Sequence, residues 1–244
     1  MRNLRLDICY DGTKYKGFQR LPGNILTIQG KLEQVLSRLL NEQIEVCGSG
    51  RTDAGTHAVG QVVSFHCNSV MSCEEILTGL RQYLPEDIGV ISVKNVSQRF
   101  HARLNAKSKT YRYRLWNSAF PCIFDRKYVY IDPSEFDVNA MRYAASFYIG
   151  THDFCAFCAN KHMKKSTIRT IESFDISEVG NELVFTVKGN GFLQHMVRIM
   201  VGTLLEVGKG VRTVDSIKTL YGVDRALAGP AVPACGLCLM EVSY

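Results

Sequence analysis

A glycine-rich stretch at residues 48–61 places a carboxylate, Asp53, two positions from a guanidinium, Arg51. Its glycines allow positive φ angles and close approach of another segment or a ligand. Residues 44–47 and 61–67 are expected to be strands, so Asp53 is predicted on a strand-to-strand connection. An aspartate in such a turn commonly bonds its own backbone. The alternative is a catalytic carboxylate.

A further charged residue, Arg198, lies within an apolar segment that predicts a buried helix over 192–207. Burying an unpaired guanidinium costs several kcal/mol, so we expect Arg198 to face a carboxylate. Asp53 is the natural candidate, because a glycine-rich loop approaches a helix closely and a guanidinium grips a carboxylate with two hydrogen bonds. Backbone carbonyl groups or another acid are the alternatives.

Cations and aromatic rings alternate along a predicted strand at 107–116. One face has Lys107, Lys109, Tyr111, Tyr113 and Leu115, and the other has Arg112, Arg114 and Trp116. Such a strand suits binding of unpaired or flipped bases. The alternative is that the rings pack in the core while the cations reach solvent.

Two further basic segments suit contacts with a phosphate backbone. The loop at 11–20 mixes cations with aromatic rings, and 161–169 is the densest basic run. An ordinary solvated face is the alternative for each.

Composition indicates a soluble cytosolic protein. The 244 residues are 46% hydrophobic, without an uninterrupted apolar run of membrane-spanning length or an apolar signal core at the N-terminus. The nine cysteines lack the density of a disulfide framework, which indicates reduced thiols. The net charge of +6 is compatible with an RNA partner only if the cations cluster.

The remaining patterns predict an α+β fold with domains at 1–103 and 104–244. Thr27 caps a helix with one apolar face, and Ser72 to Glu75 forms a capping box before another helix. Strands at 169–177 and 182–188 form a hairpin, and 213–221 is a final helix. Residues 150–158 are predicted to be a loop.

Several motifs resemble the TruA-type tRNA pseudouridine synthases. They are Tyr10-Asp-Gly-Thr-x-Tyr-x-Gly-Phe-Gln19, Arg51-Thr-Asp-Ala-Gly-x-His57, Phe100-His-Ala-Arg103 with Tyr111-Arg-Tyr113, and Phe192-Leu-Gln-His-Met-Val-Arg198. The resemblance implies isomerisation of uridine to pseudouridine at positions 38 to 40 of the tRNA anticodon stem-loop. Asp53 would be the nucleophile, Arg198 its ionic partner, and Tyr111 the ring against the uracil. The sequence leaves open whether Asp53 attacks covalently or promotes a glycal-like intermediate.

The resemblance also implies supporting roles and an architecture. Arg51 would fill the space left by the extruded nucleotide, while His57 and Gln19 would contact RNA. Two similar ferredoxin-like α+β halves would form a mainly antiparallel sheet with the active site in the cleft between them. The family members work as homodimers, and neither a cofactor nor a metal is expected.

Two alternatives from other functional classes remain. Cys155-x-x-Cys158 and Cys235-x-x-Cys238 could belong to a metal or redox site, although their separation fits no standard zinc module. A non-catalytic tRNA-binding relative would be expected to lose Asp53, Arg198 or Tyr111, and this chain has all three. Thr56 stands where the family more commonly has valine.

Overall fold

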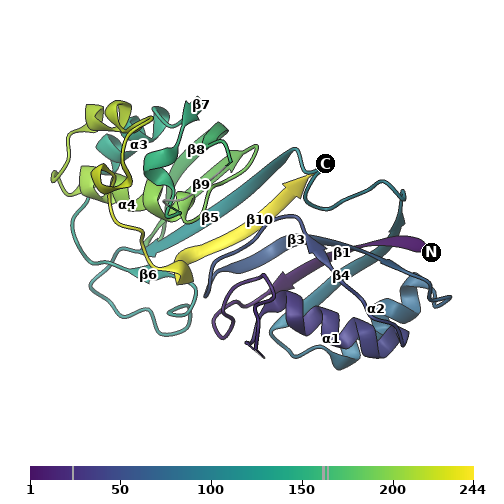
Figure 1. Ribbon diagram of the computed structural model, residues 1–244. Helices are drawn as coiled ribbons and strands as arrows, with labels where there is room; N and C mark the ends of the chain where they lie inside the picture. The colour runs from purple at the N-terminus through teal and green to yellow at the C-terminus, as the bar shows by residue number, and fades with distance from the viewer. Residues whose placement is uncertain (24, 161–162, 164) are drawn as a thin grey trace. The chain divides into compact units, whose positions relative to one another are not determined.

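The computed structural model describes residues 1–23, 25–160, 163 and 165–244. The chain divides into two compact units (Figure 1). Residues 1–107 and 238–244 form the N-terminal unit, and residues 108–237 form the central unit. Within the described residues, no helix combines the length and the hydrophobicity needed to cross a membrane.

The N-terminal unit is an α+β layer with a mainly antiparallel sheet of order β4, β1, β3, β10. These strands are β1 (Arg2–Tyr10), β3 (His57–Cys67), β4 (Ile88–Val96) and β10 (Leu237–Ser243). The short strand β2 (Cys47–Gly48) pairs with β3, and β10 runs parallel to β3 through Cys238 and Leu239. The C-terminal strand therefore groups with the first hundred residues of the chain.

Helices α1 (Ile28–Leu40) and α2 (Cys73–Tyr83) lie together on one face of this sheet (Figure 1). The Thr27 hydroxyl accepts a hydrogen bond from the Gly30 amide, which begins α1 as predicted. The predicted capping box at Ser72 is also confirmed, since both of its reciprocal bonds with Glu75 are present. Alternate residues of β1, beginning with Leu4, are buried as the pattern requires.

The central unit has a sheet of order β5, β9, β8, β7, with antiparallel pairing between these neighbours. The strands are β5 (Ser108–Trp116), β7 (Gly150–Asp153), β8 (Ile168–Val179) and β9 (Glu182–Gly189). The short strand β6 (Tyr130–Ile131) runs parallel to β5. Helices α3 (Val138–Ser146) and α4 (Met196–Gly208) contact each other, and they also contact β8 and β5 respectively. The mixed α+β fold with a mainly antiparallel sheet is confirmed.

The structure corrects three local predictions in the central unit. Helix α4 begins at Met196 rather than Phe192, because His195 has a left-handed φ of 59° that interrupts helical geometry. Residues 150–153 form strand β7 rather than a loop, since they pair with β8. The predicted last helix is a 3₁₀ segment over Val214–Leu220, followed by further 3₁₀ turns at Arg225–Leu227 and Ala234–Gly236.

Candidate functional site

Asp53 lies on a connection between two strands, as predicted, but β2 covers only Cys47–Gly48 and β3 begins at His57 rather than at residue 61. Its carbonyl accepts a hydrogen bond from the Thr56 amide at 3.1 Å, and Gly55 in between has a φ of 76°. Only glycine adopts that angle without strain, so Asp53 is carried on a tight turn whose shape depends on Gly55. The Asp53 side chain is partly exposed, as a group that meets a substrate must be.

A second segment, residues 11–18, is bonded to this turn on both sides of Asp53. The Phe18 amide donates to the Thr52 carbonyl at 3.1 Å, and the Gly55 amide donates to the Tyr15 carbonyl at 3.3 Å. Gly17 has a φ of 99°, and a Cβ there would lie 2.9 Å from the Thr52 carbonyl oxygen. Gly17, outside the glycine-rich stretch, thus lets the two backbone segments approach closely. This approach fixes the backbone that carries the carboxylate.

Buried polar side chains support the turn from the sheet below it. The hydroxyl groups of Tyr10 and Thr52 lie 2.8 Å apart, and burial raises the pKa of Tyr10 well above its usual value. Gln61 on β3 donates to the Gly50 carbonyl at 3.0 Å and accepts from Ser49 Oγ at 2.6 Å. These bonds satisfy polar groups that burial would otherwise destabilise. They also fix the residues directly before Asp53.

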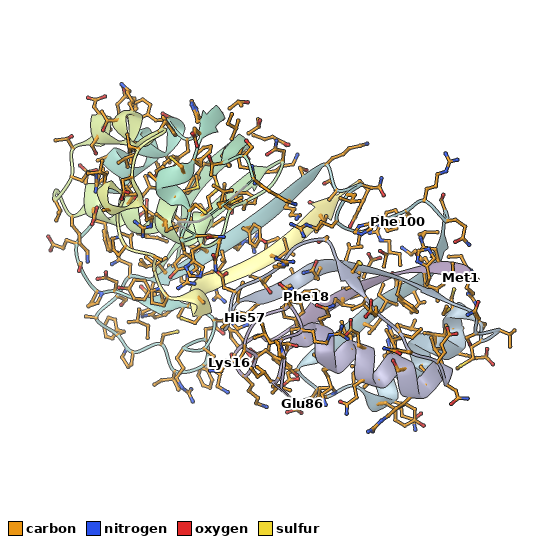
Figure 2. The ribbon with its side chains drawn as sticks, in the orientation of Figure 1. Met1, Lys16, Phe18, His57, Glu86 and Phe100 are labelled. Atoms are coloured by element: carbon orange, nitrogen blue, oxygen red, sulfur yellow. The ribbon has the colours of Figure 1, made fainter. Side chains whose placement is uncertain are left out.

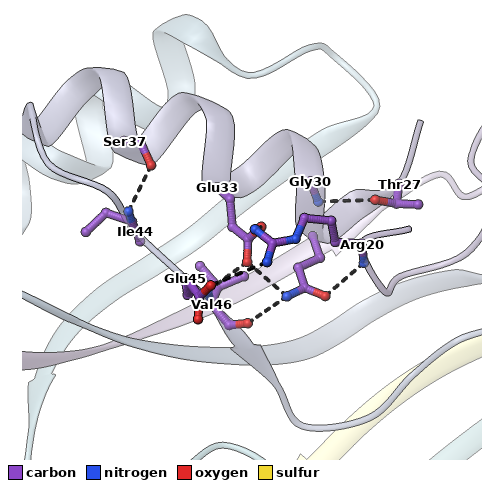
Figure 3. Close-up of polar contacts among 9 residues, drawn as sticks. Arg20, Thr27, Gly30, Glu33, Ser37, Ile44, Glu45 and Val46 are labelled. Atoms are coloured by element: carbon purple, nitrogen blue, oxygen red, sulfur yellow. Dashed lines mark hydrogen bonds and ion pairs between the residues drawn. The ribbon is translucent and has the colours of Figure 1, made fainter. Parts of the chain in front are cut away.

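The buried carboxylate of Glu33, on α1, is hydrogen-bonded to residues next to both segments (Figure 3). Glu33 is only 5% exposed, and its oxygens accept from Arg20 Nη1 at 2.9 Å and from the Val46 amide at 3.1 Å. Gln29 donates to the same carboxylate at 2.9 Å and accepts from the Arg20 amide at 2.9 Å. Arg20 follows the 11–18 segment, and Val46 precedes the Asp53 connection. The sequence predicted a helix with one apolar face here, but it did not reveal this network.

The three residues with predicted supporting roles, Arg51, His57 and Gln19, differ in their surroundings. Arg51 and Gln19 are exposed, so both side chains are accessible to a large ligand. His57 is buried, and its Nδ1 accepts a hydrogen bond from the Gly12 amide at 3.1 Å. His57 and Phe18 lie at the same end of the N-terminal unit as Lys16, an exposed cation of the 11–18 segment (Figure 2). RNA contacts by Arg51, His57 and Gln19 remain predictions.

Tyr111 lies on β5 in the central unit, where it pairs with Val187 of β9. Its side chain is 7% exposed, and its ring forms a T-shaped pair with Phe192, with 5.1 Å between ring centroids and an interplanar angle of 83°. Such an edge-to-face contact holds an aromatic ring in one orientation. Tyr113, two residues on, is fully buried and donates to the Pro233 carbonyl at 2.9 Å. For Tyr113 the core alternative is therefore the observed one.

Arg198 is one of the few residues of α4 that are not buried. Its Nε donates to the Val232 carbonyl at 2.7 Å, so a backbone carbonyl, one of the predicted alternatives, accounts for part of its hydrogen bonding. This bond fixes the stem of the guanidinium against the segment that leads into β10. Asp53 belongs to the N-terminal unit, whereas Arg198 and Tyr111 belong to the central unit. The pairing of Asp53 with Arg198 stays a prediction.

The cysteine pairs show no metal-binding geometry. Across the described residues, His, Cys, Asp and Glu side chains form no group of three or more that could hold a metal ion. Cys155 Sγ lies 3.1 Å from the Val223 carbonyl oxygen, and Cys235 Sγ lies 3.3 Å from that of Val129. The geometry of the described thiols therefore gives the metal alternative no support.

The predicted phosphate-binding run at 161–169 lies partly outside the described residues, because positions 161, 162 and 164 do not belong to them. Lys165 is exposed, and Arg169 Nη1 donates to the Ser166 and Ile168 carbonyls at 2.9 and 2.6 Å. The role of the run stays a prediction.

Comparison with known proteins assigns this α+β chain to a family. A family model described as tRNA pseudouridine synthase matches residues 8–105 and 144–244. A protein named tRNA pseudouridine synthase A 1 from Clostridium tetani is 48% identical, and relatives named tRNA pseudouridine synthase A from a Bacillus species (strain KSM-64) and Brevibacillus brevis are 44% and 40% identical. Each alignment covers 100% of both chains. The chain belongs to the tRNA pseudouridine synthase family.

Proposed function

We propose that this chain isomerises uridine to pseudouridine at positions 38, 39 and 40 in the anticodon stem-loop of tRNA. Family membership supports both the isomerase reaction and the tRNA substrate. The observation that carries the proposal is Asp53, a partly exposed carboxylate on a turn that is hydrogen-bonded on both sides. The three positions rest on the motif resemblance.

The reaction needs a carboxylate, a pocket that retains the freed base, and access to the nucleotide. The bond from ribose C1′ to uracil N1 breaks, the base turns over, and C5 bonds to C1′ before losing its proton. The proton lost from C5 is balanced by one gained at N1, so the product is an isomer of uridine and the reaction consumes no co-substrate. Asp53 initiates it, either by covalent attack or by forming a glycal-like intermediate.

Arg198 and Tyr111 complete the proposed catalytic set. A guanidinium beside Asp53 would keep that carboxylate aimed at the nucleotide. The bond from Arg198 Nε to Val232 supports this role, because it limits the positions that the guanidinium can take. Tyr111 would stack on the uracil and assist removal of the C5 proton. Its edge contact with Phe192 supports a fixed ring orientation.

Three residues near Asp53 are proposed to contribute to RNA binding. Arg51 is exposed beside the nucleophile and would occupy the space left when the target nucleotide leaves its stem. Gln19 is exposed at the end of the 11–18 segment and would contact the backbone. His57 is buried, so its contribution would come through the Gly12 amide that it holds.

The proposal includes the architecture in which the enzyme works. Two similar halves, 1–103 and 104–244, would enclose the active-site cleft. Two copies would form a homodimer in the cytoplasm, so that both basic surfaces follow one L-shaped tRNA. These features rest on the resemblance and on the excess of Lys and Arg over Asp and Glu.

The experiment is pseudouridine mapping on unmodified tRNA transcripts incubated with the enzyme. We expect product at whichever of positions 38, 39 and 40 is a uridine. Transcripts in which each of these uridines is replaced by cytidine in turn are the matched controls, and each should lose one signal only. Product at other positions would contradict the site assignment, and binding without any product would favour the non-catalytic alternative.

A further inference from the structure

The connection from β5 to β6 exposes large apolar side chains at its tip. Phe124 is 93% exposed, Phe120 is 75% exposed and Ile123 is 55% exposed. Several exposed apolar residues in one short loop normally mark an interaction surface. This tip lies in the stretch between 105 and 144, which the family model does not match. The catalytic set described above uses none of these residues.

Hydrogen bonds within the loop restrain its backbone. Trp116 Nε1 donates to the Phe120 carbonyl at 2.7 Å, and the Tyr128 amide donates to the Asp125 carbonyl at 2.7 Å. The Cys122 side chain between them is buried at 7% exposure. A loop that is ordered before binding loses less conformational entropy when a partner arrives. The backbone that carries the exposed rings is therefore restrained before a partner binds.

Three charged residues, Asp125, Arg126 and Lys127, directly follow Phe124 in the loop. The Asp125 carboxylate turns back to Arg114, with 2.8 Å between Oδ2 and Nη2. Arg114 also bonds Glu182 at 2.7 and 2.6 Å, and these hydrogen bonds raise the pKa of Arg114. Arg126 and Lys127 are both exposed directly after Asp125. Phe124 is thus followed in the chain by two exposed cations, of which Arg126 also donates a hydrogen bond to the Ile123 carbonyl.

We propose that this tip is a tRNA-contact element in which Phe124 stacks on an unpaired base while Arg126 and Lys127 contact the flanking phosphates. Single-stranded RNA is commonly bound by aromatic rings next to cations, because every base has a π-face and every nucleotide has a phosphate. The inference rests on the proposed function for its substrate. It goes beyond that function by adding an RNA contact separate from the reacting uridine.

Three substitutions at Phe124 test stacking against simple apolar contact. Phe124→Ala removes the ring, Phe124→Leu keeps an apolar side chain without a π-face, and Phe124→Trp keeps the π-face. Because the side chain is 93% exposed, none of the three should unfold the protein. Tyr83→Ala, which removes a 60% exposed ring from α2, is the matched control.

The measurements are the Kd for unmodified tRNA, the rate of pseudouridine formation at saturating tRNA, and the oligomeric state by sedimentation. We expect Phe124→Ala and Phe124→Leu to raise the Kd by about 5- to 150-fold, as loss of one stacked base predicts. Phe124→Trp and Tyr83→Ala should stay within about twofold of the wild-type Kd, in the range of surface substitutions that touch no special feature. The saturated rate and the oligomeric state should not change.

Two results would overturn the inference. An unchanged Kd in Phe124→Ala would show that the ring does not touch RNA. A Phe124→Leu protein that binds like the wild type, together with a changed oligomeric state in Phe124→Ala, would assign the tip to contact between copies of the chain. Wild-type protein that binds tRNA without forming product would refute the proposed function alone, since the Kd series still decides the role of Phe124.

Discussion

The hydroxyl groups of Tyr10 and Thr52 lie 2.8 Å apart within the buried layer directly before Asp53. This bond joins the end of β1 to the connection that carries the proposed nucleophile. Together with the main-chain bonds from Phe18 and Gly55, it restrains Asp53 from three directions. A nucleophile held in this way needs little reorganisation when the substrate binds.

Tyr10→Phe should therefore lower both stability and activity. Loss of the bond leaves the Thr52 hydroxyl buried without its partner, which costs about 1–2 kcal/mol of unfolding free energy. We expect the saturated rate to fall about tenfold, because small displacements of a reacting group slow catalysis. The control is Tyr148→Phe, which removes a buried hydroxyl bonded to the Met200 carbonyl in the central unit. Equal loss of activity in both variants would contradict a positioning role for Tyr10.

Two threonines on either side of Asp53 should respond oppositely to the same change. Thr52 is hydrogen-bonded to Tyr10, whereas the buried Thr56 hydroxyl, 1% exposed, has no hydrogen-bond partner among the described residues. Thr52→Val should lower the unfolding free energy by about 1–2 kcal/mol, and Thr56→Val should leave it unchanged or raise it by about 1 kcal/mol. Urea titration of both variants measures this. A marked destabilisation by Thr56→Val would reveal a partner for that hydroxyl.

Glu33→Gln should weaken the support of the Asp53 connection. The carboxylate accepts from three donors, and an amide nitrogen in its place would face one of them. We expect a loss of about 1–3 kcal/mol in unfolding free energy. Glu45→Gln is the matched control, because Glu45 meets the same Arg20 at 3.4 Å with a side chain that is 70% exposed. An equal effect of the two changes would mean that burial of Glu33 contributes nothing.

Asp132 predicts a pH dependence of stability. Burial alone would raise its pKa, but hydrogen bonds from Lys209 and Ser134 outweigh burial and lower the pKa from its usual 3.8. The unfolded chain therefore binds this proton at higher pH than the folded chain. The stabilisation is complete above about pH 4 and is lost as the pH falls through the folded pKa.

The stability difference between the wild type and Asp132→Asn should therefore be largest near neutral pH and should shrink toward pH 2–3. Asp175→Asn, which changes an exposed carboxylate on β8, is the control. A wild-type advantage that persists undiminished at pH 2 would exclude the lowered pKa as its source. Thermal unfolding at a series of pH values provides the comparison.

The sequence best predicted those structural features that depend on residues close together in the chain. The caps at Thr27 and Ser72, and the hairpin that turns at Gly180 with a φ of 59°, depend on neighbouring residues and are confirmed. The start of α4 was predicted too early because the left-handed His195 is a non-glycine residue that no propensity marks. Nor could a pattern reveal that β10 pairs with β3, since that pairing joins opposite ends of the chain.

For the candidate site, the sequence identified the motif residues but not the side chains that hold them in place. Thr52 belongs to the Arg-Thr-Asp motif, so its place beside Asp53 could have suggested a supporting role. Tyr10, Gln61 and Glu33 meet the site only through tertiary contacts with partners 11 to 51 positions away, which composition and periodicity do not encode. The exposure of Phe124 depends in the same way on the folded loop.

The most direct measurement compares pseudouridine formation by the wild type and by Asp53→Asn on the same unmodified tRNA transcripts, with tRNA binding measured in parallel. Asparagine keeps the size of the side chain and removes its negative charge and nucleophilicity. The account predicts product at positions 38 to 40 with the wild type and none with Asp53→Asn, while the Kd for tRNA stays within about threefold, a change of less than 1 kcal/mol. Pseudouridine formed by Asp53→Asn at the wild-type rate would contradict it.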